Sequence, residues 1–229
     1  MHSALILAPF LFLSSCFSLS ALKKTAAVSS SSVTPLSGFF NNAFATEPAT
    51  LRDDKVLDFV KQARAVGPIG INSPEEERKA LVSVAKEDIA SLSDKKPARV
   101  PLSGLHKLVY SASPGGSSGK IGPFVGKVTQ EFVDDVTFIN AVSLGPVKIA
   151  LRAEREVKSD TAIKVTFRET TVTLFGNKVT SKLIENSGGV WKYVFSGVVT
   201  DTNGRQKLVR VMETPSLFVL EQDLWTNHK

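Results

Sequence analysis

Between Leu105 and Leu220, apolar residues recur at every second position, and this alternation is the feature that most restricts the fold. The segment VKIALRAER, which begins at Val147, sets Val, Ile, Leu and Ala against Lys, Arg and Glu, and IKVTFRET, which begins at Ile163, repeats the pattern. A period of two places successive side chains on opposite faces of a strand, so each segment has one apolar face. The sequence therefore predicts a series of strands with no helix between them.

Turn signals separate these segments: Gly145-Pro146, Gly176-Asn177, Ser187-Gly188-Gly189 and Asn203-Gly204. The last is a dipeptide favoured in tight hairpins. About eight or nine antiparallel strands with one apolar face close most economically into a barrel. A barrel of about eight strands has an interior wide enough for one small ligand. We therefore expect a mainly β fold, with an antiparallel β-barrel over residues 101–222 and a tail over 223–229.

Two amphipathic helices are expected ahead of the barrel, within residues 47–100. The first, over 51–66, has Val56, Leu57, Val60 and Ala63 at helical spacing, and Gly67-Pro68 ends it. The second begins with Ser73 as N-cap, Pro74 at the first helical position and Glu76 in a capping box. Its apolar positions are Ala80, Leu81, Val84, Ala85 and Ile89, and SDKKP ends it. These helices are expected to pack on the barrel.

The segment SASPGGSSGKIGPF, residues 111–124, raises the question of a phosphate-binding loop. A P-loop needs two glycines separated by four residues, then Lys, then Ser or Thr, and a helix must follow. Here Gly115 and Gly119 are separated by three residues, Ile121 follows Lys120, and the chain continues as an alternating strand. We expect a mobile loop between strands, and Gly115, Gly116, Gly119 and Lys120 are candidates for gating the mouth of the barrel.

The N-terminus reads as a leader in two parts. Residues 1–16 contain the short apolar run ALILAPFLFLSSC, which suits a signal peptide and is too short for a membrane span. Residues 17–46 are rich in Ser, Ala and Thr, carry Lys23 and Lys24 and contain no acid, as in an organellar transit peptide. Ala43 and Ala45 form a possible second processing site. The pattern predicts targeting to a plastid with extra membranes, as in some algae; the alternative is a secretory signal with a disordered linker.

The composition leaves little material for catalysis. The single cysteine, Cys16, lies in the leader, which excludes a disulfide framework, a zinc-thiolate site and a cysteine nucleophile in the mature protein. Only His106 lies inside the expected domain, because His2 and His228 lie near the ends. Neither a Ser-His-Asp triad nor a two-histidine metal site can be assembled. We therefore expect no catalytic residues, no metal and no cofactor.

The net charge of +6 invites a nucleic-acid interpretation. The excess of basic residues is spread evenly, however, and no cluster of Lys and Arg alternates with aromatic residues. We expect mild attraction to an anionic surface and no nucleic-acid partner.

Several segments together resemble the plastid lipid-associated proteins, also called plastoglobulins or plastid fibrillins. They are LHKLVYSASPGGSSGKIGPFVGKVTQEFVDDVTFINAV from Leu105, TFRETTVTLFG, GGVWKYVFSG and KLVRVMETPSLFVLEQ. The resemblance spans residues 51–221 and implies a lipocalin-like barrel, location in the stroma, on plastoglobules or on thylakoids, and binding of prenyl lipids, carotenoids or acyl lipids without catalysis. An aspartate common in the family has no clear counterpart, and Asp201 is its nearest candidate.

The inward-facing positions of the strands give candidate ligand-binding residues. These are Val128, Phe132, Phe138, Ile149, Leu151, Val165, Phe167 and Trp191. The alternative for each is an ordinary core residue in a filled barrel. Trp191, Tyr193, Phe195 and Gly197 are expected on one face of their strand, either walling the cavity or forming an outward patch for a lipid surface or a covering helix.

Two other classes of function compete with a lipid-binding barrel. One is a structural coat or scaffold of plastid lipid bodies without an internal ligand, which basic charge and amphipathic helices would serve. The other is an enzyme using Asp134-Asp135 or Glu154 and Glu156 as paired acids. Adjacent residues of a strand face opposite ways, and Asp134-Asp135 falls in an expected hairpin, so solvated acids are the better explanation.

Overall fold

A computed structural model describes residues 49–67, 72–113, 118–214 and 216–224. The expected leader lies outside these residues. The helices are α1 (Ala49–Val66) and α2 (Glu75–Val84), followed by the short turns η2 (Ala85–Ile89, a π-helix), η3 (Ala90–Leu92) and η4 (Pro97–Arg99). The strands are β1 (Gly104–Ser111), β2 (Lys120–Ile121), β3 (Phe124–Val125), β4 (Lys127–Phe132), β5 (Thr137–Leu144), β6 (Val147–Val157), β7 (Ala162–Leu174), β8 (Asn177–Leu183), β9 (Gly188–Thr200), β10 (Gln206–Glu213) and β11 (Leu217–Leu224).

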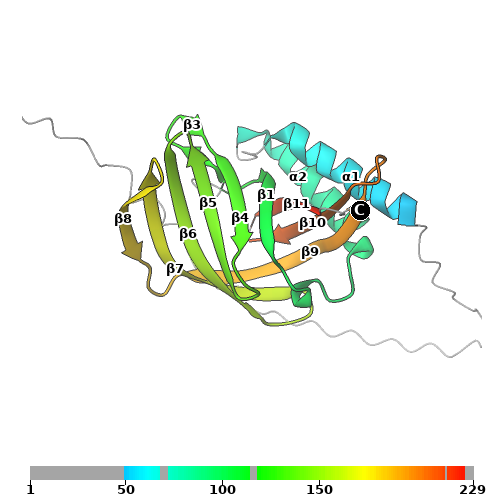
Figure 1. The fold of residues 1–229 in the computed structure, drawn as a ribbon. Helices are drawn as coiled ribbons and strands as arrows, with labels where there is room; N and C mark the ends of the chain where they lie inside the picture. The colour runs from blue at the N-terminus through cyan, green and yellow to red at the C-terminus, as the bar shows by residue number, and fades with distance from the viewer. Residues whose placement is uncertain (1–48, 68–71, 114–117, 215, 225–229) are drawn as a thin grey trace, which may run out of the picture. The chain divides into compact units, whose positions relative to one another are not determined.

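Eight of these strands form a closed antiparallel barrel in the order β1-β4-β5-β6-β7-β9-β10-β11, with β11 paired to β1 (Figure 1). Each barrel strand pairs with the next barrel strand along the chain, so the topology is a meander. The short hairpin β2–β3 is inserted after β1, and β8 is inserted after β7. The structure confirms the expected mainly β fold, with a barrel preceded by two helices. We call the end that carries the loop 112–126 and the turns 145–146 and 175–176 the loop end.

Strand β7 shows why a ninth strand lies beside the barrel. Its residues 162–166 pair with β9, and its residues 169–174 pair with β8. Between these ladders, the backbone N–H of Ile184 donates to the carbonyl of Arg168 (2.9 Å) and that of Phe167 donates to the carbonyl of Ser187 (3.0 Å). Residues 177–192 thus follow a single edge of β7. Strand β8 is the part of this run that extends beyond the barrel wall at the loop end.

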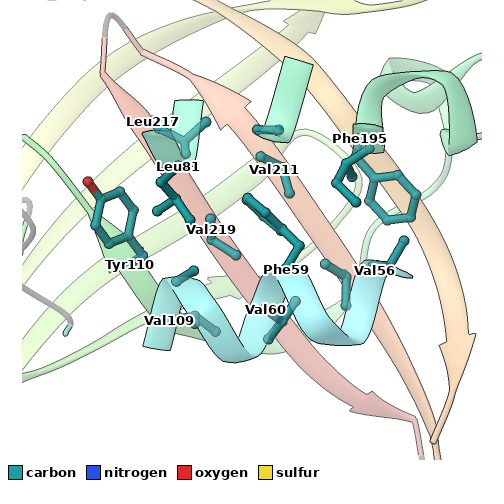
Figure 2. Close-up of a cluster of buried hydrophobic side chains, with 14 of the residues drawn as sticks. Val56, Phe59, Val60, Leu81, Val109, Tyr110, Phe195, Val211, Leu217 and Val219 are labelled. Atoms are coloured by element: carbon teal, nitrogen blue, oxygen red, sulfur yellow. The ribbon is translucent and has the colours of Figure 1, made fainter. Parts of the chain in front are cut away.

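The helices cover the outer face of β9, β10, β11 and β1 (Figure 1). Figure 2 shows Phe59 and Val60 of α1 and Leu81 of α2 against Val211 and Val219 of the strands. Burial of each large apolar side chain contributes roughly 1.5–3 kcal/mol. The apolar faces of both helices are therefore used in packing against the barrel.

A β-bulge at Val194 corrects the expected facing of the aromatic residues of β9. Met212 of β10 pairs with Tyr193, whereas the preceding Val211 pairs with Phe195. The extra residue reverses the alternation. Trp191 and Tyr193 therefore point into the barrel, while Phe195 points outward into the core beneath the helices.

Gly197 lies on the same outward face as Phe195. A side chain at this glycine would clash with Arg52 of α1, whose guanidinium lies 5.5 Å from the ring centre of Phe195. The proposed wall or patch of four residues on one face therefore does not exist. Two of the four residues face the interior and two face the helices.

The start of α2 also differs from the expectation. The N-cap is Pro74, and no side chain caps the helix. The Ser73 hydroxyl donates instead to the carbonyl of Val66 at the end of α1 (3.2 Å). Local sequence suggested a capping box here, but a contact with the preceding helix takes the hydroxyl.

Candidate functional site

All eight predicted lining residues lie on the inner face of the barrel, as the strand register shows. Phe132 pairs with Phe138, which pairs with Ala153, which in turn pairs with Phe167. Four further pairings place the other lining residues on the same face. Val128 and Ile149 both pair with Val142, Leu151 pairs with Asn140, and Val165 pairs with Arg155. Trp191 pairs with the buried Ile163 of β7.

These eight residues fall into two groups. Phe132, Phe138, Val165 and Trp191 are buried in the inner core, where aromatic rings pack with centres 5.3–5.8 Å apart. The remaining four, Val128, Ile149, Leu151 and Phe167, are only half-buried and lie toward the loop end. The residues of the first group fill the barrel, in agreement with the alternative prediction that they are ordinary core residues. The second leaves apolar surface on the inner face.

The opposite end of the barrel is covered by the segment that leads into β1. Ala98 of η4 donates its backbone N–H to the carbonyl of Asp160 (2.9 Å), and both Ala98 and Leu102 belong to the inner core. Because this segment covers one end of the barrel, a ligand would have to reach the inner apolar surface from the loop end.

The loop predicted to gate the barrel is described only in part, because Gly115 and Gly116 lie outside the described residues. Gly119 is buried and accepts a hydrogen bond from the backbone N–H of Gly126 (2.8 Å). A Cβ at Gly119 would lie 2.7 Å from a methyl group of Val128, and one at Gly126 would lie 2.6 Å from a methyl group of Val142. Lys120 is exposed, and strands rather than a helix follow it. The loop thus packs closely on the lining residues of the loop end, and gating stays a prediction.

Sequence reasoning missed the polar side chains inside the barrel. His106, Gln130, Arg155 and Arg210 are all buried on the inner face. A signal for them was present. Each stands at an alternate position otherwise held by apolar residues, as in Leu208-Val209-Arg210-Val211-Met212. Because β10 is also covered by helices on its outer face, both faces of this strand are buried, and an Arg within it has no route to solvent.

Arg210 is fully buried, and the described residues that accept its hydrogen bonds are neutral. Its Nη1 donates to the side-chain oxygen of Gln130 (2.7 Å), and its Nη2 donates to the Tyr193 hydroxyl (3.2 Å). The Phe132 ring centre lies 5.1 Å from the guanidinium. Among the described residues, the Nε of Arg210 has no hydrogen-bond partner and no carboxylate forms an ion pair with this side chain. Burial lowers the pKa of Arg210, although an arginine stays protonated in proteins.

His106 lies beside this group and is also fully buried. It pairs with Gln130 across the β1–β4 ladder, and its ring meets Phe132 edge-to-face at 5.4 Å. Burial, and then the charge of Arg210, lower the pKa of His106 to about 3. An interaction of the imidazole with the backbone of Ser103 opposes this lowering of the pKa and is the smallest of the three effects. The imidazole is therefore neutral near pH 7, and neither of its nitrogens makes a hydrogen bond of good geometry among the described residues.

Arg155, the second buried guanidinium, is fully engaged. It forms an ion pair with Asp135 and donates to the carbonyls of Ala98 and Val100 (3.4 Å each). Asp135 is thus the counter-ion of a buried arginine rather than a merely solvated acid. Its neighbour Asp134 accepts hydrogen bonds from the backbone N–H groups of Val136 and Thr137, which lower the pKa of its carboxyl.

The other acids considered above also have structural partners. Glu154 pairs with Arg168 (2.7 Å), and Glu156 pairs with Lys158 (2.5 Å). Asp201 accepts hydrogen bonds from the backbone of Asn203 and Arg205 in the β9–β10 turn. In the described ranges, no group of three or more His, Cys, Asp or Glu is placed to hold a metal ion.

Comparisons with protein-family models, with curated proteins and with solved structures find no match to this chain. None of the helices in the described part of the chain is long and apolar enough to cross a membrane.

Proposed function

We propose that the protein binds a hydrophobic small molecule in its barrel without catalysing a reaction. The observation that carries the proposal is the half-buried apolar surface of the inner face at the loop end, formed by Val128, Ile149, Leu151 and Phe167. Transfer of apolar ligand surface from water to such a site is worth roughly 25 cal/mol per Å². The sequence resemblance supports prenyl lipids, carotenoids or acyl lipids as ligands, and a plastid as the location.

Native mass spectrometry of the purified protein, followed by lipid extraction, tests the proposal. We expect a co-purified lipid or pigment at a stoichiometry near one. Leu151→Glu places a charge on the half-buried inner surface and should abolish the bound mass, while Val179→Glu, on the exposed strand β8, is the matched control and should retain it. A folded protein that binds no lipid, whether added or co-purified, would reject an internal ligand.

A second candidate is association with a lipid surface, and the rim of the loop end favours it. Phe124, Val125 and Phe175 are 60%, 50% and 77% exposed there. Their segments are neighbours: Gly126 packs on the end of β5, and the backbone N–H of Phe175 donates to the carbonyl of Pro146 (2.9 Å).

The charged residues in the three segments of this rim are all basic, and one of them, Lys178, forms an ion pair with Glu169 of β7 (3.3 Å). Segments 118–127, 143–148 and 173–178 carry the four lysines Lys120, Lys127, Lys148 and Lys178 and no acid. Exposed aromatic rings with lysines around them suit an anionic lipid surface. The helices do not suit this role, because their apolar faces are buried against the barrel.

Co-flotation with vesicles distinguishes the two candidates. Binding to vesicles that contain an anionic lipid, its loss in a Phe124→Ser/Phe175→Ser variant and its retention in Val179→Ser would support docking through the rim. If this docking occurs without an internal ligand, the coat or scaffold function is favoured. If the protein floats equally well with neutral vesicles and regardless of the two aromatic residues, docking through the rim is rejected.

A further inference from the structure

We propose that the barrel contains a binding site for the carboxylate of an aliphatic acid, with Arg210 as its cation and the hydrocarbon tail along the half-buried apolar surface at the loop end. This inference rests on the proposed function, binding of a hydrophobic molecule, and adds the chemical class of its head group.

Arg210 carries a buried charge without a counter-ion among the described residues. Charged side chains are almost never fully buried unless they are paired, because loss of hydration is costly. Arg210 is fully buried, yet Gln130 and Tyr193, which accept its hydrogen bonds, are neutral. A carboxylate supplies the missing charge and accepts the parallel hydrogen bonds that a guanidinium donates.

Buried polar atoms around Arg210 are left without good hydrogen-bond partners among the described residues. Buried polar atoms nearly always have a hydrogen-bond partner, and exceptions call for a physical explanation. Nε of Arg210 is such an exception among the described residues. The ring nitrogens of the neighbouring His106 make no hydrogen bond of good geometry there either, and they interact only with the backbone of Ser103. The neutral imidazole has one N–H to donate. A ligand carboxylate placed between these side chains would accept from both Nε of Arg210 and the imidazole.

Hydrogen-bonded amide side chains connect Arg210 with the half-buried part of the inner face. Gln130 accepts from Arg210 with its oxygen and donates from its nitrogen to the side-chain oxygen of Asn140 (2.9 Å). Asn140 is only half-buried and pairs with Leu151 across the β5–β6 ladder. The next inward pair toward the loop end is Val128 with Val142. In the proposed complex, the carboxylate lies beyond the side-chain amides of Asn140 and Gln130, next to Arg210, and the tail contacts the apolar surface nearer the loop end.

The second buried guanidinium does not compete for this anion. Arg155 already has Asp135 as its counter-ion and two backbone carbonyls as acceptors. The Phe132 ring lies beside both guanidiniums, 5.9 Å from that of Arg155 and 5.1 Å from that of Arg210. Of the two buried guanidiniums among the described residues, that of Arg155 has a counter-ion and that of Arg210 has none, so one monoanionic ligand would neutralise the second.

Binding of cis-parinaric acid, compared with that of its methyl ester, tests the inference by fluorescence titration of the purified protein. The two probes share a tail and differ in the charge of the head group. A hydrogen-bonded buried charge pair predicts a preference for the acid of at least about tenfold. Arg210→Gln should abolish the preference while ester affinity changes little, and Arg168→Gln, at an arginine that is 52% exposed, should keep it.

If Arg210→Gln does not fold, the titration of the unchanged protein with acid and ester still tests the carboxylate site. Tyr193→Phe, which removes only a hydroxyl, should reduce the preference for the acid several-fold. Equal affinity for acid and ester overturns the carboxylate site and leaves the proposed function standing. A preference for the acid that survives in folded Arg210→Gln also overturns the site. Failure to bind either probe rejects both the site and an acyl ligand.

Discussion

Arg210 of β10 and Gln130 of β4 are joined by a hydrogen bond of 2.7 Å across the barrel interior, although β11 and β1 separate their strands in the sheet. Arg210 is fully buried, Gln130 is 1% exposed, and this amide is the nearest hydrogen-bond acceptor of the guanidinium. The bond ties two walls of the barrel through a charge that burial makes costly. Although Gln130 is neutral, its loss should therefore destabilise the barrel strongly, because it is the nearest acceptor of a buried charge.

Gln130→Leu should destabilise the protein by about 3 kcal/mol, because it leaves a buried guanidinium without its main acceptor. Adding Arg210→Met should recover most of that loss, since the double variant removes the charge together with its partner. Urea unfolding of the two single variants and the double variant measures the coupling. A double variant as unstable as Gln130→Leu alone would contradict the assigned role of the hydrogen bond.

His106 predicts a pH dependence of stability. Its pKa is about 3 in the folded protein, against the ordinary value of 6.5. Between these values the unfolded chain binds a proton that the folded chain does not, so stability rises with pH through this window and is fully present above pH 6.5. From pH 7 to pH 5 the protein should lose about 2 kcal/mol through this residue.

The control for this prediction is His106→Leu. Carboxyl groups titrate equally in both proteins, so the difference between their unfolding free energies isolates the histidine. We expect the difference in unfolding free energy between the two proteins to change by about 2 kcal/mol between pH 7 and pH 5. A difference that stays constant would show that His106 has a similar pKa in the folded and unfolded chains.

The parts of the fold that followed from the sequence are those set by short-range pattern. Alternation marked the inward positions of β4 to β7, and Asn203-Gly204 marked the β9–β10 hairpin, where Gly204 has a φ of +74°. The reversal at Val194 could not be foreseen, because it arises from the register between β9 and β10 rather than from either strand alone. The contact that draws Ser73 away from the α2 N-terminus is likewise tertiary.

The candidate site was only half accessible to sequence reasoning. The apolar lining residues followed from periodicity, whereas Arg210, His106 and Gln130 were passed over because a polar residue in a strand is ordinarily solvated. Their burial becomes visible only once the helices are placed on the outer face of β10 and β11, which leaves no solvent on either side. Apolar residues on both faces of a strand that contains one Arg are the local signal to search for.

Asp135 should matter for stability although its side chain is 62% exposed, because it is the counter-ion of Arg155, whose side chain is 2% exposed. Asp135→Ala leaves that guanidinium with carbonyl acceptors only, and we expect a loss of about 1–3 kcal/mol. Glu156→Ala, which breaks the exposed pair with Lys158, is the control and should not measurably change the unfolding midpoint. Equal effects of the two substitutions would argue that Arg155 does not need its carboxylate.

Gly188 is the first residue of β9 and pairs with Thr166, so it lies at the start of the β7–β9 pairing, which we call the seam of the barrel. A Cβ at this position would overlap the backbone carbonyl oxygen of Val165 and lie 3.1 Å from the Cα of Thr166, and neither atom belongs to a side chain that can rotate away. Gly188→Ala should therefore push β9 from β7 and cost roughly 1–3 kcal/mol of unfolding free energy.

The control is Gly145→Asn, at a turn glycine with a φ of +54° and no atom within 4 Å of an added Cβ. Asn tolerates this backbone conformation, so stability should change little. Hydrogen exchange then localises the effect in Gly188→Ala: the amides of Lys164 and Val190, which are paired across the seam, should lose protection before those of β10 and β11. Unchanged protection along the seam would mean that β7 and β9 absorb the extra carbon without separating, and the contact would not limit closure of the barrel.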